Sequence, residues 1–74
     1  MAYVIRGISS DGSDHGDEHF TVGPDVGFVK YDEAFSYAAL YASSVSDTDR
    51  VSRIGNHVIA TGESYAELLT VNWE

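Results

Sequence analysis

The chain has 74 residues, and its twelve Asp and Glu against four Lys and Arg give a formal net charge of -8. A chain this short buries only about 60% of the surface that its unfolded form exposes, so one core in one domain is expected, and a deep catalytic cleft would compete with that core. The acidic balance opposes direct binding to nucleic acid or to anionic lipid, and it favours a partner with a basic surface.

Composition also limits the setting in which the protein works. Hydrophobic residues make up 43% of the chain, which is typical of a folded globule. The absence of cysteine excludes disulfide bonds, thiolate metal sites and a cysteine nucleophile. The longest uncharged run, residues 35–46, is too short and too polar to cross a bilayer, and the chain does not start like a signal peptide. We therefore expect a cytoplasmic protein in the host cell, with no membrane contact.

The first third of the chain predicts two strands joined by a polar loop. Residues 2–8 (AYVIRGI) are β-branched and aromatic and carry apolar groups on both faces, as a central strand does. Residues 9–19 (SSDGSDHGDEH) contain no apolar side chain and predict an exposed loop that leads to a second strand at residues 20–22. Residues 23–25 (GPD) predict a turn. Residues 26–29 fit either a short strand or an extended approach to the next element.

Residues 32–45 (DEAFSYAALYASSV) predict the helix of the fold, because two acids open it and alanines fill it. An acidic stretch at residues 46–49 ends it. At 100° per residue, the expected core stripe is Tyr31, Phe35, Ala38, Ala42 and Val45. The opposite side of the helix is expected to carry Glu33, Ser36, Tyr37, Leu40 and Ser44.

The last third predicts a hairpin and a further strand. Residues 50–54 and 57–61 are β-type runs on either side of Gly55-Asn56, a two-residue loop that favours a hairpin. Residues 65–73 alternate apolar and polar side chains as a half-buried strand does, although residues 65–68 also fit a helical turn. The expected fold is therefore one α+β domain over residues 1–74. It has an antiparallel sheet of about four to five strands, in the order β-β-α-β-β-β, with one helix packed on one face.

The polar loop invites a metal-site interpretation. Measured from Asp11, the EF-hand template needs Asp or Asn at the third and fifth positions and a bidentate Glu at the twelfth, where this chain has Ser13, His15 and Val22. A calcium loop is therefore not predicted. His15 and His19, with the acids between them, leave a zinc or nickel site open as an alternative.

Catalytic patterns are weak throughout the chain. Residues 62–66 (GESYA) resemble a nucleophile elbow, but no His follows Ser64, so a plain turn is expected. His57 begins a predicted strand without an identifiable acid and nucleophile. The sequence has no phosphate loop, dinucleotide fingerprint or HExxH motif. We therefore expect a protein that is not an enzyme and uses no cofactor.

Two features favour binding to a protein partner. The first is the spacing of the acids, which could occupy the positions that phosphates take in a groove rich in Lys and Arg; the alternative is that they only keep the protein soluble. These residues are Asp11, Asp14, Asp17, Glu18, Asp32, Glu33, Asp47 and Asp49. The second feature is Tyr37 and Leu40, which lie on the predicted outer side of the helix and could anchor a partner, or be ordinary exposed apolar residues.

In overall character the chain resembles the small phage-encoded anti-CRISPR inhibitors. The likeness rests on a compact antiparallel sheet with one Ala-rich helix (FSYAALYASS), on the absence of cysteine and of a catalytic set, and on a surplus of acids such as DGSDHGDE. The resemblance implies docking on a CRISPR effector, typically a guide-RNA surveillance complex, and a block of DNA recognition or nuclease recruitment. It assigns no role to an individual residue.

Two other classes of function stay open at this point. One is a metal-binding or sensing module that uses His15, His19 and the neighbouring acids. The other is a structural or assembly domain, including a homodimer that pairs helices or an edge strand.

Overall fold

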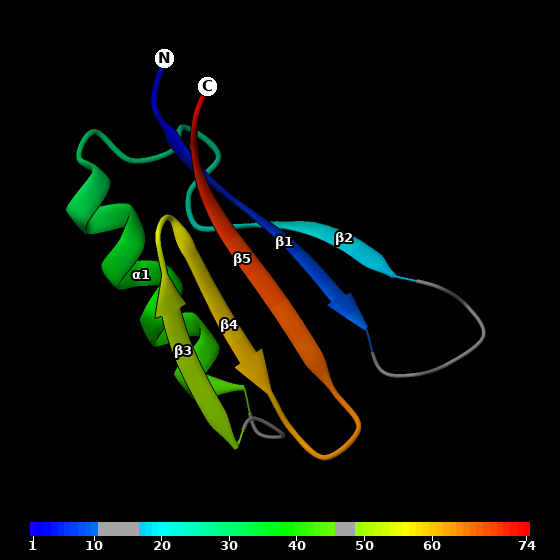
Figure 1. Ribbon diagram of the computed structural model, residues 1–74. Coiled ribbons are helices and arrows are strands. Elements are labelled where there is room, and N and C mark those ends of the chain that lie inside the picture. Colours follow the sequence, from blue (N-terminus) through cyan, green and yellow to red (C-terminus); the bar gives the residue numbers. More distant parts are fainter. Residues whose placement is uncertain (11–16, 46–48) are drawn as a thin grey trace.

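The structure, a computed structural model, describes residues 1–10, 17–45 and 49–74. These residues form one helix and five strands in the predicted chain order, which confirms the α+β fold class (Figure 1). The elements are β1 (Tyr3–Ser10), β2 (Glu18–Val22), α1 (Tyr31–Ser44), β3 (Arg50–Ile54), β4 (His57–Thr61) and β5 (Ala66–Trp73).

The five strands form a single antiparallel sheet in the order β2-β1-β5-β4-β3. This order differs from the chain order because β5 returns between β1 and β4, where it pairs along its whole length with β1, from Tyr3 opposite Trp73 to Ser10 opposite Ala66. β1 is therefore flanked on both sides, as its apolar groups on both faces predicted. The two chain ends lie side by side, with the Ala2 amide donating to the Glu74 carbonyl at 2.8 Å.

Helix α1 packs on one face of the sheet (Figure 1). The core between them contains Ile5, Val58, Leu69 and Val71 from the strands. The helix contributes Ala34, Ala38 and Ala42, all fully buried. Because the side chain of alanine is a single methyl group, the helix backbone can approach the sheet closely. The buried stripe is thus centred on alanines, while Tyr31 and Phe35, which the sequence prediction included in the core stripe, lie half-buried at its margin.

The largest boundary difference from the sequence prediction lies at the 9–19 loop. β1 continues to Ser10 and β2 begins at Glu18, so the ends of the predicted 9–19 loop are strand. Backbone pairing between Ser9 and Glu18 explains this, since strand ladders need backbone partners and not apolar side chains. The alternative helical turn at residues 65–68 is wrong, because Ala66 already pairs with both β1 and β4.

Turns that the sequence predicted are present. Gly55 has a positive φ of 59°, and Asn56 does not, which is the backbone pattern of a type II′ hairpin turn. The Gly27 amide donates to the Pro24 carbonyl at 2.9 Å and closes the turn that follows β2. Residues 26–29 form neither a strand nor a continuously extended segment, because Val26 lies in this turn, Gly27 has a positive φ of 77° and Phe28 makes only an isolated bridge with Tyr3.

Candidate interaction surface

The side of α1 that faces away from the sheet is exposed along its whole length, as predicted. We call this surface the outer helix face; it consists of Glu33, Ser36, Tyr37, Leu40 and Ser44. Leu40 is 71% exposed and Tyr37 is 44% exposed, whereas Ala38 and Ala42 on the inner side are fully buried. The outer helix face therefore presents two large apolar side chains that contribute little to the core.

Aromatic packing holds the flank of this face in place. Tyr37 packs against Phe28, with ring centroids 5.3 Å apart, and Tyr41 packs against Phe20 of β2 at 6.2 Å. Between them the surface has a shallow hollow of about 360 Å³, lined by Tyr37, Leu40, Tyr41 and Ser44. The sequence did not predict the part of Tyr41, because it does not reveal that the helix flank meets the edge strand β2.

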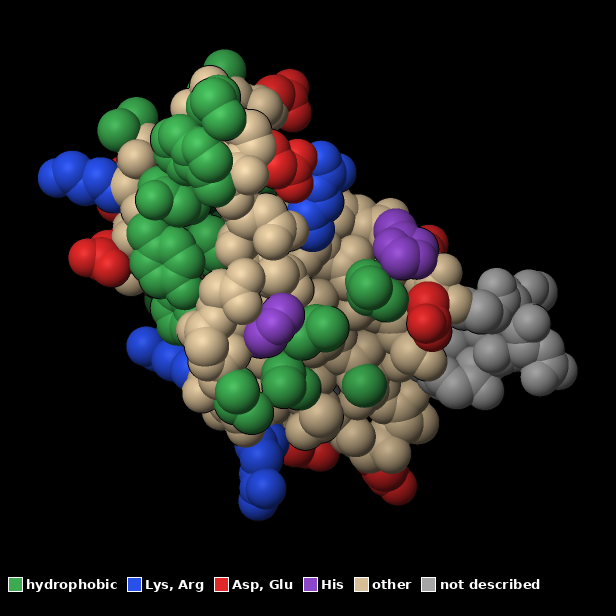
Figure 2. All heavy atoms as spheres, turned by 45° about the horizontal axis from the view of Figure 1, so that its top comes forward, with side chains coloured by type: hydrophobic (Ala, Val, Ile, Leu, Met, Phe, Trp, Pro, Cys, Tyr) green, Lys and Arg blue, Asp and Glu red, His purple; other side chains and the backbone are tan. Residues whose placement is uncertain are grey.

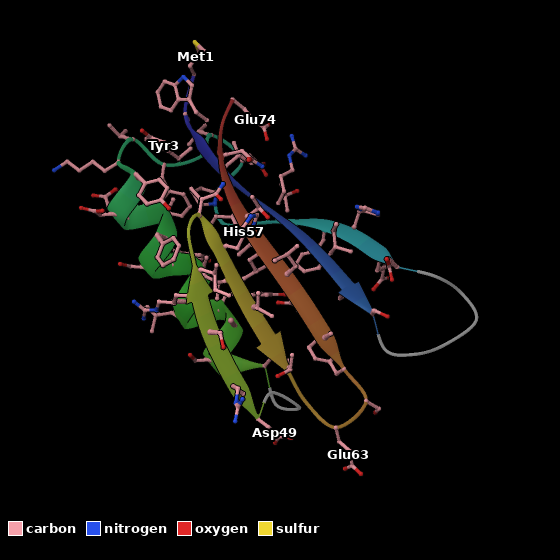
Figure 3. All side chains as sticks on the ribbon, viewed as in Figure 1. Met1, Tyr3, Asp49, His57, Glu63 and Glu74 are labelled. Carbon is pink, nitrogen blue, oxygen red and sulfur yellow. The ribbon has the colours of Figure 1, made fainter. Side chains whose placement is uncertain are left out.

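Those predicted acidic residues that the structure describes are exposed but do not form one patch. Asp32 and Glu33 lie in the first turn of α1, where their negative charges interact favourably with the positive end of the helix dipole. Asp49 lies at the end of the molecule opposite Met1 and Glu74, near Glu63 (Figure 3). Asp17 and Glu18 lie at the start of β2, on the sheet edge opposite β3. Asp11, Asp14 and Asp47 fall outside the described residues.

The structure reveals a buried acid that sequence reasoning missed. Glu67 is only 3% exposed, and its side chain lies on the helix-facing side of β5, in alternation with Leu69 and Val71. One carboxylate oxygen, Oε2, accepts a hydrogen bond from the Tyr65 hydroxyl, and the other, Oε1, has no hydrogen-bond partner among the described residues. Burial raises the pKa of Tyr41, and the Glu67 carboxylate raises it further. The sequence did contain a signal for this burial. Glu67, Leu69 and Val71 lie two residues apart, so their side chains share one face of the strand.

The arrangement does not bring the metal-site candidates together. His19 and Glu18 are neighbours on β2 and so point to opposite faces of the sheet, and His15 lies outside the described residues. Within the part of the chain that the structure describes, no three His, Asp or Glu side chains form a group able to hold a metal ion.

The structure also places the two weaker catalytic candidates, His57 and Ser64. His57 Nδ1 lies 2.9 Å from the Thr70 hydroxyl on the neighbouring strand β5. Ser64 lies in the turn that precedes β5, and a strand follows it where a nucleophile elbow needs a helix. The expectation of a plain turn at residues 62–64 is therefore confirmed.

Comparison with known protein families, curated proteins and solved structures found no match to this chain. Among the described residues, no helix has the length and apolar character that crossing a bilayer requires.

Proposed function

We propose that this protein is a non-enzymatic binding protein that docks through its outer helix face on a Lys/Arg-rich protein surface. The observation that carries this proposal is the exposure of Tyr37 and Leu40 next to the acids that open α1, in a chain of net charge -8. Tyr is favoured at the centre of protein interfaces, and flanking carboxylates steer the approach of a basic partner.

The spacing of the outer helix face suits a helix that inserts into a groove. Positions 33, 36, 37, 40 and 44 recur at intervals of three and four residues, so their side chains form one continuous stripe. Tyr37 already packs on Phe28, which limits the conformational entropy that it would lose on binding. Leu40 is 71% exposed and would therefore gain the most from a partner pocket.

The partner class that we propose is a CRISPR effector complex in the host cytoplasm, in line with the resemblance to anti-CRISPR inhibitors. Such a complex holds DNA with Lys and Arg side chains, and the Asp32 and Glu33 carboxylates would compete for these cations. Occupation of that surface would block DNA recognition or nuclease recruitment.

The test is to titrate purified guide-RNA surveillance complexes with this protein and to measure binding and target-DNA capture at several salt concentrations. We expect Leu40→Ala and Tyr37→Ala each to weaken binding by about tenfold or more. The variant Asp32→Asn/Glu33→Gln should slow association and flatten the salt dependence. Val26→Ala is the matched control, because Val26 is 83% exposed but lies in the loop before α1.

Either of two results would contradict the proposal. One is the absence of binding to any of the complexes. The other is binding that Leu40→Ala and Val26→Ala reduce equally, since the outer helix face would then have no special part in it.

A further inference from the structure

The sheet face that points away from α1 is not covered by any described segment (Figure 1). We call it the open face. Strand alternation shows which side chains lie on this face. The buried residues Ile5, Val58 and Leu69 point toward the helix, so their neighbours along each strand point to the open face. In Figure 2 hydrophobic and histidine side chains are scattered over this face, and acidic side chains lie toward its rim.

An apolar row crosses the centre of the open face. The strand register places Ile8 of β1 beside Leu68 of β5, and Leu68 beside Ile59 of β4. Ile8 is 36% exposed, and the other two are half-buried although no described element covers them. These three side chains, with Ser10, Asp17 and neighbouring strand atoms, line a shallow hollow of about 320 Å³.

The open face is close to neutral in a strongly acidic molecule. None of the described strand side chains that point to this face is Asp or Glu. The Arg6 guanidinium donates to both carboxylate oxygens of Glu74, with its Nε 2.8 Å from Oε2, so this pair cancels. What remains is one charge of each sign at opposite edges, with Asp17 beside β2 and Arg50 on β3.

These two charges lie in the same row across the sheet. Arg50 pairs with Thr61, Thr61 with Ala66, and Ala66 with Ser10. Asp17 precedes Glu18, the partner of Ser9, so it continues this row beyond Ser10 on the β2 side. The row therefore begins with a carboxylate at one edge of the sheet and ends with a guanidinium at the other.

We propose that the open face is a self-association surface, on which a second copy of this chain packs face to face about a two-fold axis parallel to the central strand β5. Such an axis places β2 of one copy over β3 of the other and keeps each row over its counterpart. Asp17 of each copy then meets Arg50 of the other, at both edges of the interface. In the apolar row, Leu68 meets its own symmetry mate and Ile8 meets Ile59.

Charge favours this arrangement over other ways of pairing two copies of the chain. Parallel helix-to-helix pairing would oppose Asp32 and Glu33 with their own copies, at a cost in like-charge repulsion, and antiparallel pairing would place them beside a last helical turn that has no basic residue. A two-fold axis perpendicular to the strands would place β2 over β2 with the rows reversed, and would leave Asp17 and Arg50 without opposite charges. The axis parallel to β5 satisfies both charges at once.

The size of the face sets the expected strength. Five strands about 4.8 Å apart, each with about five residues at about 3.3 Å, give a face of roughly 400 Å² per copy. Two such faces bury less than a standard protein interface, so we expect a reversible dimer that dissociates in roughly the micromolar range or above.

The test is sedimentation velocity of the full chain from roughly 1 µM to 1 mM, the range suited to a weak interface. We expect the mass to rise from one chain toward two. Leu68→Lys should weaken dimerisation at least tenfold, because it opposes two cations at the axis. Leu40→Lys makes the same charge change on the outer helix face and should leave dimerisation unchanged. Circular dichroism shows whether each variant is folded.

A charge exchange tests the symmetry independently of folding. Asp17→Arg and Arg50→Asp should each weaken the dimer several-fold, and the double variant should restore it. Asp17→Arg is the sharper case, because it lowers the net negative charge and on general electrostatics would promote association. A mass of one chain at every concentration overturns the proposal, and so does a double variant that associates no better than the single ones.

This inference does not rest on the proposed function, and the variants separate the two. Leu40 variants report on partner binding and Leu68 variants on self-association, so either property can fail while the other holds.

Discussion

The two faces of the sheet are built from the same strands but have opposite characters. The face under α1 is dry and well packed, with Ile5, Val58 and Leu69 fully buried. The open face has a central apolar row, further apolar side chains at Val4 and Ile54, hydroxyl, amide and imidazole groups between them, and charges that balance. Because neighbouring residues in a strand point to opposite faces, each strand contributes to both surfaces. Folding stability is therefore concentrated on one face, while the other stays exposed.

The largest expected difference is between the adjacent residues Leu69 and Leu68. Leu69→Ala should cost about 2–5 kcal/mol, because it leaves a cavity in a core that cannot collapse around it. Leu68→Ala should cost about 1 kcal/mol or less, since this side chain lies on the open face. Urea denaturation at a protein concentration below the dimer range measures both values. Equal losses would contradict the assignment of the two faces.

A substitution at Gly7 tests how tightly Phe20 of the edge strand β2 packs on the sheet face under α1. A Cβ at Gly7 would collide with the ring of Phe20 and would lie 2.9 Å from Leu69 Cδ2. We expect Gly7→Ala to destabilise the fold by about 1–3 kcal/mol through overpacking. The second substitution Phe20→Leu should recover part of this loss. If the double variant is no more stable than Gly7→Ala, steric pressure from Phe20 is not the cause.

Glu67 is the exception on the covered face, and removing its charge should stabilise the protein. Glu67→Met replaces a buried carboxylate with one oxygen that has no partner in the described part of the chain, so we expect a gain of about 1 kcal/mol in the free energy of unfolding. The same change should bring the pKa of Tyr41 closer to its ordinary value, because Glu67 contributes to raising it. Spectroscopic titration of tyrosine checks this, with Tyr41→Phe identifying the signal. A net loss of stability would show that the hydrogen bond from Tyr65 outweighs the buried charge.

The smallest expected effect concerns the exposed Arg6–Glu74 pair on the open face. The hydrogen bond from Arg6 lowers the pKa of the Glu74 carboxyl, so the folded state binds this proton less readily than the unfolded state. The stability that the pair provides is present at neutral pH and is lost as the pH falls below about 4.5, through the pKa of the folded state. Glu74→Gln should therefore lower the melting temperature slightly at pH 7 and have no effect near pH 2. An equal shift at both pH values would contradict an electrostatic contribution.

Much of the fold could be predicted from local patterns. The Gly55-Asn56 hairpin has its predicted strand ranges, and α1 is shifted by one residue from the predicted helix. The outer helix face was predicted residue by residue, because a helix repeats every 3.6 residues and its polar side follows from spacing. The interface role assigned to that face, and to the acids, stays a prediction.

Sequence reasoning was weaker where a residue depends on a distant partner. Ser9, Ser10 and Glu18 belong to strands because the neighbouring chain offers backbone hydrogen bonds, and their own side chains give no sign of it. Glu67 was not recognised as buried, since its burial results from its register with Ser9 and Ala60 on the two flanking strands. Each of these assignments requires knowledge of which strands are neighbours.

By itself, the sequence determined the acidic charge, which is a property of composition. It also determined the element types, the turns and the exposed side of the helix, because these depend on residues within a few positions of one another. The tertiary structure alone decided that β5 lies between β1 and β4, and hence which side chains share a row. The balance of charge on the open face, with Asp17 and Arg50 at opposite ends of one row, follows from this strand order. Strand order is fixed by packing and long-range backbone pairing, which no local pattern encodes.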